Sequence, residues 1–91
     1  MGWTIKLTPK AEHELSRLER NVAVRIKNTL KNIEALENPR QKGKALTGPL
    51  GEFWSYRAGD YRILCKIEDK EIVVLVVKIA HRKEVYKRRK N

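Results

Sequence analysis

The stretch from residue 53 to residue 79 constrains the fold most, because three strand-like segments follow one another there at short intervals. They are Phe53–Arg57 (FWSYR), Tyr61–Ile67 (YRILCKI) and Ile72–Ile79 (IVVLVVKI), and all are rich in aromatic and β-branched residues. Links of three and four residues separate them, and links this short connect only antiparallel neighbours. The sequence therefore predicts an antiparallel meander of three strands.

The residues before this stretch predict one more strand and two helices. Apolar and polar residues alternate from Trp3 to Leu7, which is the period of a half-buried strand. Thr8 has a capping oxygen and Pro9 needs no amide donor, so a helix is expected to begin there. A second helix is expected from near Asn21 to Glu37. The apolar faces of the two helices are formed by Ala11, Leu15 and Leu18 and by Val22, Ile26, Leu30 and Ile33.

The segment between the helices and the meander, residues 38–52 (NPRQKGKALTGPLGE), is expected to be a surface loop. It has three glycines and two prolines, with only Ala45, Leu46 and Leu50 available for burial. The apolar run of the last strand predicts a central position, flanked by the N-terminal strand. The predicted fold class is α+β, with two N-terminal helices packed on a mainly antiparallel four-stranded sheet, order β-α-α-β-β-β, and a short basic C-terminal tail. Residues 1–91 are expected to form one domain, because a chain this short closes a single core.

The charge of the chain is strongly positive and unevenly distributed. Lys and Arg number 21 against 11 Asp and Glu, for a net charge of +10, and residues 40–91 alone carry an excess of +8 (14 basic less 6 acidic). Such an excess predicts a polyanion or an acidic protein as partner. The alternative is a basic surface that serves only solubility.

The location expected for the protein is the cytoplasm, with no membrane attachment. The longest apolar run, IVVLVV, has the length of a strand and not of a membrane span. The first residues lack the apolar core of a signal peptide, and a lone cysteine, Cys65, cannot form an intramolecular disulfide.

Antiparallel order places several cations at one end of the predicted meander. Arg57 ends one strand and Arg62 begins the next, and the last strand returns beside it, so His81 and Arg82 should emerge at the same end. Strand alternation puts Arg62 on the face opposite to that of Ile63 and its apolar neighbours. The alternative for Arg62 is an exposed arginine paired with a nearby carboxylate.

The residues that follow the last strand, AHRKEVYKRRKN, are again basic. Residues 87–90 are expected to form a mobile tail that attracts phosphate, with Lys83 and Lys87 among the phosphate-binding candidates. His81 is either a surface residue or a group that exchanges protons near neutral pH. Tyr86 covers the edge of the core, stacks on a base or assists proton transfer.

Other kinds of chemistry lack the residues that they need. No Asp, Glu and His residues have the spacing of metal ligands, so neither a metal nor another cofactor is expected. Cys65 alternates with isoleucines and is expected in the core. An arginine-rich site without metal suits cleavage of RNA by its own 2′-hydroxyl group. Arg62 could hold the phosphate, His81 or Tyr86 could transfer protons, and Arg57 and Arg82 could bind neighbouring phosphates.

The motifs GDYR (59–62) and HRKEVY (81–86), at this separation, resemble those of the RelE/ParE toxins of toxin–antitoxin pairs, and the RelE branch in particular. The resemblance covers nearly the whole chain. It implies a ribosome-dependent endoribonuclease that cleaves mRNA in the ribosomal A site, and a RelB-like protein antitoxin as partner in a hetero-oligomer. It also implies that Arg62 stabilises the phosphate, that Arg82 donates a proton, and that Tyr86 stacks on a base or transfers a proton.

The chain departs from the family pattern on the strand before GDYR, where Phe53 and Ser55 stand in place of lysines. Lys44, Arg57 or His81 could supply the missing function, and the general base stays open among His81, Tyr86 and Lys44. Two other functions are compatible with the resemblance: a ParE-like inhibitor of DNA gyrase, or a degenerate module that only binds its antitoxin.

Overall fold

The computed structural model of the protein describes residues 2–46 and 51–87, the last three of these by their backbone alone. The first half forms β1 (Thr4–Leu7), α1 (Pro9–Ser16), α2 (Arg20–Glu34) and a 3₁₀ turn, η1 (Pro39–Gln41). The second half forms β2 (Lys44–Ala45), β3 (Trp54–Ala58), β4 (Tyr61–Glu68), β5 (Val73–His81) and α3 (Arg82–Lys87). This order confirms the predicted α+β class and adds three short elements, η1, β2 and α3.

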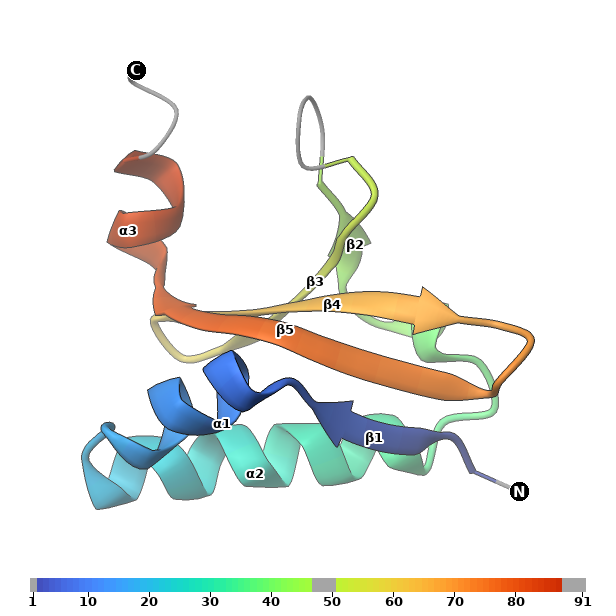
Figure 1. The fold of residues 1–91 in the computed structure, drawn as a ribbon, viewed down its shortest axis with the longest axis horizontal. Coiled ribbons are helices and arrows are strands. Elements are labelled where there is room, and N and C mark those ends of the chain that lie inside the picture. Colours follow the sequence, from blue (N-terminus) through green and yellow to red (C-terminus); the bar gives the residue numbers. More distant parts are fainter. Residues whose placement is uncertain (1, 47–50, 88–91) are drawn as a thin grey trace.

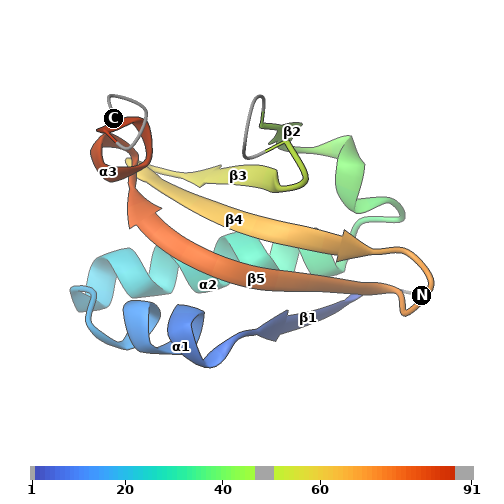
Figure 2. The same cartoon turned by 45° about the horizontal axis from the view of Figure 1, so that its top comes forward.

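The sheet has five strands in the order β1-β5-β4-β3-β2, one more than predicted (Figure 2). β3, β4 and β5 form the expected antiparallel meander, and β5 lies between β4 and a parallel β1. The additional strand is β2, which pairs with β3 through Lys44 opposite Ser55 and Ala45 opposite Trp54. Two residues inside a loop rich in glycine and proline carry no detectable strand pattern.

Both predicted helices begin where their sequences indicate. The Thr8 side chain accepts a hydrogen bond from the Ala11 amide at 3.1 Å, and Pro9 is the first residue of α1. α2 begins at Arg20 and ends at Glu34, three residues before the predicted end. The Glu34 carbonyl accepts a hydrogen bond from the Trp3 amide at 3.2 Å, which ties the end of α2 to the start of β1.

The hydrophobic core lies between the two helices and one face of the sheet (Figure 1). The buried residues are Ala11 from α1, Ile26, Leu30 and Ile33 from α2, and Tyr56, Ala58, Ile63, Cys65, Val74, Val76 and Ile79 from the sheet. The face of β4 that carries Ile63 and Cys65 therefore meets the helices, which settles a question that the sequence left open. Arg62 directly precedes Ile63 and, by strand alternation, belongs to the opposite face.

The loop after α2 is held by three aromatic side chains that donate to its backbone carbonyls. Trp3 Nε1 donates to Glu37 O at 3.1 Å, and the buried Tyr56 hydroxyl donates to Pro39 O at 2.6 Å. Trp54 Nε1 donates to Lys42 O at 2.7 Å. The loop was expected to bury only Ala45, Leu46 and Leu50. Instead Pro39 is buried, Ala45 is exposed, Leu46 is half-buried, and Leu50 lies outside the described residues.

The segment after β5 forms the helix α3, which the sequence analysis did not predict. The predicted tail began at residue 87, where this helix ends. Its first residue, Arg82, donates its amide to Asp60 O at 2.7 Å, which fixes the helix to the turn between β3 and β4. His81 Nδ1 accepts a hydrogen bond from the Lys83 amide at 3.1 Å and thereby caps the helix. Lys87 is the last residue of α3, and the rest of the predicted tail lies outside the described residues.

Replacing Tyr56 with phenylalanine is expected to lower the free energy of unfolding by about 1–3 kcal/mol, because the buried Pro39 carbonyl loses its donor. Burial raises the pKa of Tyr56 above its ordinary value of 10.0. The protonated hydroxyl is therefore favoured in the folded state, and this part of the stability is complete below about pH 10 and is lost as the pH rises further. Urea unfolding of both proteins at several pH values measures the difference.

The control for Tyr56 is Tyr61→Phe, at a half-buried position on the same face of the sheet. We expect the gap in stability between wild type and Tyr56→Phe to narrow above pH 10. An equal loss in the two variants, or a gap that does not change with pH, contradicts the assigned role of the Tyr56 hydroxyl.

Candidate functional site

Two of the three arginines of the predicted site lie opposite each other on neighbouring strands. Arg57 of β3 pairs in register with Arg62 of β4, and His81 of β5 pairs with Tyr61 beside them. The prediction that Arg57, Arg62 and His81 share one end of the sheet is confirmed. Like charges directly opposite each other destabilise a sheet. A bound anion would reduce the repulsion between Arg57 and Arg62.

α3 stands at the same end of the sheet, on the side away from α1 and α2 (Figure 1). The exposed residues Arg82 and Lys83 begin this helix. Tyr86 and Lys87 belong to its last turn, and their side chains lie outside the described residues. Arg82 therefore also reaches the common end of the sheet, through the bond between its amide and Asp60 O.

The His81 ring is fixed by two contacts. Its centroid lies 5.3 Å from that of the Tyr61 ring, with 77° between the planes. A ring nitrogen that accepts a hydrogen bond carries no proton, so the bond from the Lys83 amide to Nδ1 leaves the proton of the neutral ring on Nε2. His81 could accept a proton at Nδ1 only by giving up the cap of α3.

A cleft of about 480 Å³ opens beside the arginines and runs from β3 to α2. It is lined by Thr29, Asn32, Ile33, Lys42, Gly43, Lys44, Ser55, Tyr56, Arg57 and Arg62. Four of these residues are cations and none is a carboxylate. The cleft therefore attracts anions, and its cations come from both the loop and the sheet.

Two lysines lie beside the positions where the family pattern has lysines and this chain does not. Lys44 of β2 is the register partner of Ser55, and partners in an antiparallel pair project to the same face. Lys66 of β4 has its Nζ 5.9 Å from the centroid of the Phe53 ring. Each lysine is one strand away from the expected position. Sequence reasoning missed Lys66, because only the register of β3 and β4 brings it to Phe53.

Ser55 has an unusual environment within the cleft. Its side chain is 1% exposed, and Oγ has no hydrogen-bond partner in the part of the chain that the structure describes. Buried hydroxyl groups are rarely left in this state in native proteins.

α2 contributes polar residues that sequence reasoning also missed. Thr29 and Asn32 line the cleft, and the Arg25 guanidinium lies against the turn at Gly59. Gly59 has a φ of 63°, and a Cβ there would lie 2.7 Å from Arg25 Nη1. Arg25, Thr29 and Asn32 have the spacing i, i+4, i+7, so the signal was a polar stripe beside the apolar stripe of α2.

The carboxylates with ion pairs in the described segments lie outside the cleft. Glu14 accepts hydrogen bonds from Lys78 Nζ at 3.4 Å and from the Ile79 amide at 2.8 Å. Asp69 binds Arg40 through two bonds of 2.9 and 3.1 Å, and this contact lowers the pKa of the Asp69 carboxyl group. The ion pairs of Glu14 and Asp69 therefore involve none of the residues that line the cleft.

Cys65 is a core residue, as predicted. It is fully buried, and this burial raises the pKa of its thiol to about 12. The thiolate is the reactive form of cysteine, so Cys65 is no nucleophile at neutral pH. No group of three or more His, Cys, Asp and Glu side chains that could hold a metal ion occurs in residues 2–46 and 51–87. Over the same residues, no helix is both long enough and apolar enough to cross a membrane.

Comparison with known proteins gives one family. The model of the ParE toxin of the type II toxin–antitoxin system parDE matches residues 5–86. The toxin RelG of Mycobacterium tuberculosis is 29% identical over 89 residues, which cover 97% of this chain and 100% of RelG. The toxin RelE of the same organism is 31% identical over 83 residues, which cover 91% of this chain and 84% of the relative.

Solved structures give the same result for the fold. A chain of the M. tuberculosis RelBE2 toxin–antitoxin complex superposes with a TM-score of 0.79 at 24% identity, over 89% of this chain and 92% of that chain. A mutant of the Escherichia coli toxin RelE in the free state superposes with a TM-score of 0.73 at 25% identity. The superposition covers 96% of this chain and 93% of the RelE chain.

Proposed function

Since the chain belongs to the RelE/ParE family of toxins of type II toxin–antitoxin systems, we propose that it is a ribosome-dependent endoribonuclease. It cleaves mRNA in the ribosomal A site in the cytoplasm and so stops translation. The observation that carries the proposal is the pairing of Arg57 with Arg62 at the edge of a cleft that is lined by cations and by no carboxylate.

The reaction uses the 2′-hydroxyl group of the RNA as nucleophile. Its oxygen forms a bond to phosphorus, the bond from phosphorus to the 5′-oxygen breaks, and the products are a 2′,3′-cyclic phosphate and a 5′-hydroxyl end. The proton of the 2′-hydroxyl passes to a base, and a donor protonates the leaving oxygen. Charge builds on the phosphoryl oxygens, and the planar forks of Arg57 and Arg62 suit this charge.

Lys44 and Lys66 take over the two lysine positions that Phe53 and Ser55 leave empty. Both lysines belong to strands that flank β3, beside these two residues. A cation displaced by one strand moves by about 5 Å, the spacing of neighbouring strands. A flexible lysine side chain spans this distance. Lys44 therefore stays beside the reacting phosphate, and Lys66 reaches the next phosphate of the RNA.

The proton acceptor is Lys44 or Tyr86, and His81 has another role. His81 holds the start of α3 through Nδ1, which supports a positioning role. Arg82 begins the same helix and acts as the proton donor. Lys83 and Lys87, also on α3, bind phosphates outside the cleaved bond.

The partner that restrains the toxin is a cognate RelB-like antitoxin in a hetero-oligomeric complex. Related chains have been solved in RelBE complexes from M. tuberculosis and E. coli. An acidic antitoxin segment fits the net charge of +10 and would compete with RNA for the same cations.

The test is a translation reaction with a defined mRNA and purified protein, with and without ribosomes. New RNA ends are mapped by primer extension. We expect cuts only when ribosomes are present and only in the codon that occupies the A site. Intact mRNA in the presence of active ribosomes contradicts the proposal.

A second candidate function is supported by the matched family model, which describes the ParE branch. A ParE-like toxin would trap DNA gyrase on cleaved DNA and leave mRNA whole. A DNA cleavage assay with gyrase, run on the same protein, separates the two functions. A degenerate module would bind an antitoxin and be inactive in both assays.

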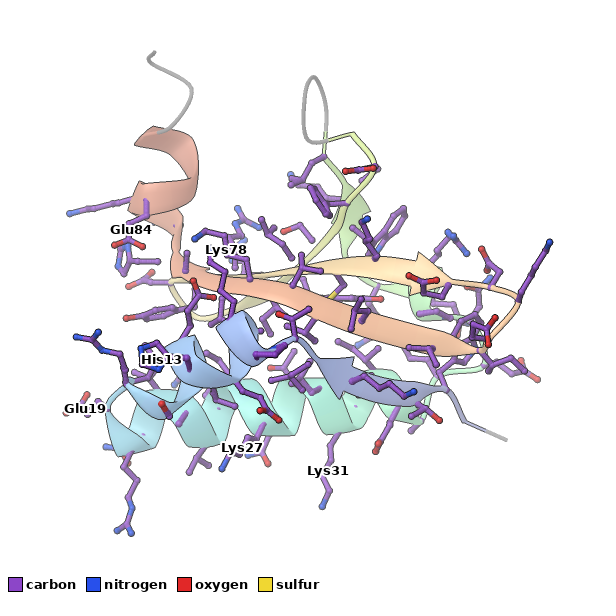
Figure 3. The ribbon with its side chains drawn as sticks, viewed as in Figure 1. His13, Glu19, Lys27, Lys31, Lys78 and Glu84 are labelled. Carbon is purple, nitrogen blue, oxygen red and sulfur yellow. The ribbon has the colours of Figure 1, made fainter. Side chains whose placement is uncertain are left out.

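Replacing Lys44 or Lys66 with alanine is expected to slow mRNA cleavage about tenfold, the effect of losing one charge-assisted contact in the transition state. The control is Lys27→Ala, an exposed lysine on the side of α2 away from the sheet (Figure 3). The rate of appearance of RNA ends measures the effect. If both variants cleave as fast as Lys27→Ala, the displaced lysines do not replace the missing ones.

A further inference from the structure

The part of the cleft nearest α2 holds polar groups for which the proposed phosphate chemistry has no use. We propose that this cleft binds a single nucleotide of the RNA, with its phosphate on the cations and its base or ribose on Ser55, Thr29 and Asn32. The inference rests on the proposed function only for the source of the nucleotide. The lining itself defines the class of ligand as a nucleoside phosphate.

Ser55 belongs to the lining of the cleft, and its buried Oγ has no hydrogen-bond partner within the described residues. Its pairing with Leu64 places its side chain on the same face of the sheet as Arg57 and Arg62. A ribose hydroxyl or a base nitrogen that entered the cleft would complete this hydrogen bond. The neighbouring Lys44 would bind a phosphate attached to the same nucleotide.

The α2 side of the cleft presents groups that suit a base. Thr29 Oγ1 donates its proton to Arg25 O at 3.0 Å, so towards a ligand it acts as an acceptor. The Asn32 side-chain amide has a donor next to an acceptor and has no hydrogen bond of its own within residues 2–46 and 51–87. This pair of groups is complementary to the hydrogen-bonding edge of a nucleobase.

Charge and size agree with a nucleotide. Inorganic phosphate could contact the cations of the cleft but would leave the Asn32 amide and the Ser55 hydroxyl unused. The volume of about 480 Å³ lies within the range of about 300–1,000 Å³ that is usual for small-ligand sites.

The loop that forms one wall of the cleft is held in place before any ligand arrives. Gly43 has a φ of 74°, and a Cβ there would lie 2.5 Å from Ser55 O and 2.7 Å from Trp54 Nε1. Only glycine therefore lets the loop approach β3 this closely. The Trp54 indole also donates to Lys42 O at 2.7 Å, which makes its N–H a reporter of events in the cleft.

The first test is an NMR titration of the full chain with 5′-AMP, 5′-CMP, 5′-GMP and 5′-UMP, each compared with inorganic phosphate. We expect at least one nucleotide to shift the Trp54 indole N–H and the amides of Ser55 and Asn32 at concentrations about tenfold below those needed with phosphate. Equal shifts at equal concentrations of phosphate would overturn the proposal, because the base and ribose then contribute nothing.

Ser55→Ala tests the buried hydroxyl. Removal of an unpartnered buried hydroxyl should leave the thermal unfolding midpoint unchanged or raise it, while nucleotide binding weakens about threefold to tenfold. Lys27→Ala is the control and should bind as the wild type does. Unchanged affinity in Ser55→Ala, with the fold intact, would overturn the role of Ser55.

Asn32→Asp tests recognition of the base in the ribosome reaction. A carboxylate only accepts hydrogen bonds, so the distribution of bases at the cut positions should change while cleavage continues. An unchanged distribution overturns base recognition by Asn32. If the wild-type protein binds nucleotides but makes no cuts, the proposed nucleotide site is supported and the ribonuclease function is overturned. Failure of one proposal can therefore be told apart from failure of the other.

Discussion

Replacing Arg62 with alanine is expected to slow mRNA cleavage in the ribosome reaction by about 10²- to 10³-fold, the effect of removing one preorganised donor from a developing oxyanion. Arg62 lies opposite Arg57 at the edge of the cleft, on the face of the sheet away from the helices. Its two-pronged guanidinium matches two phosphoryl oxygens at once. Single-turnover rates, measured from the appearance of new RNA ends, give the size of the effect.

Two variants control this experiment. Arg20→Ala removes an exposed arginine at the start of α2, outside the cleft, and is expected to cleave at the wild-type rate. Arg62→Lys keeps the charge but loses the fork, so its rate should fall between those of wild type and Arg62→Ala. A folded Arg62→Ala protein with the full cleavage rate would remove Arg62 from the reaction and, with it, the main support for the proposed function.

Replacing Ile26 with alanine is expected to lower the free energy of unfolding by about 2–5 kcal/mol. Ile26 is 0% exposed and lies in the core between α2 and the sheet. The substitution removes apolar contacts and leaves a cavity that the sheet can fill only in part. Since domains of this kind are stable by about 5–15 kcal/mol, the loss is a large share of the total. Urea unfolding followed by circular dichroism measures it.

The same helix provides the matched controls. Val24 is 50% exposed, so Val24→Ala should change the stability by less than about 0.5 kcal/mol. Ile26→Val removes one methylene group and should lower the stability by about 0.5–1.5 kcal/mol. A similar loss in Val24→Ala and Ile26→Ala would contradict the role of burial, because alanine has the higher helix propensity at both positions.

Sequence alone predicted the shared end of the sheet because that feature depends on local quantities. Short links require antiparallel neighbours, and antiparallel neighbours bring Arg57, Arg62 and His81 together whatever the details of packing. The N-terminal cap at Thr8 and the place of Cys65 in the core also depend on nearby residues. These predictions agree with the structure.

The cleft could not be predicted, because its walls are far apart in the sequence. Asn32 reaches it from a helix, Lys44 from a two-residue strand and Ser55 from the meander, and only tertiary packing brings them together. α3 was missed for a related reason. Its start depends on a bond from the Arg82 amide to Asp60 O, which lies in a distant turn. A six-residue helix has little stability without such contacts.

The parallel pairing of β1 with β5 makes the order of synthesis matter for folding. β1 is the first strand of the chain and β5 is the last, with Thr4 opposite Val73. β5 must therefore be synthesised before β1 can pair with it in the sheet, and contacts of such long sequence separation form slowly. Until then the nascent chain also lacks the start of α3. The end of the sheet that carries Arg57, Arg62 and His81 is therefore assembled only after β5 has been synthesised.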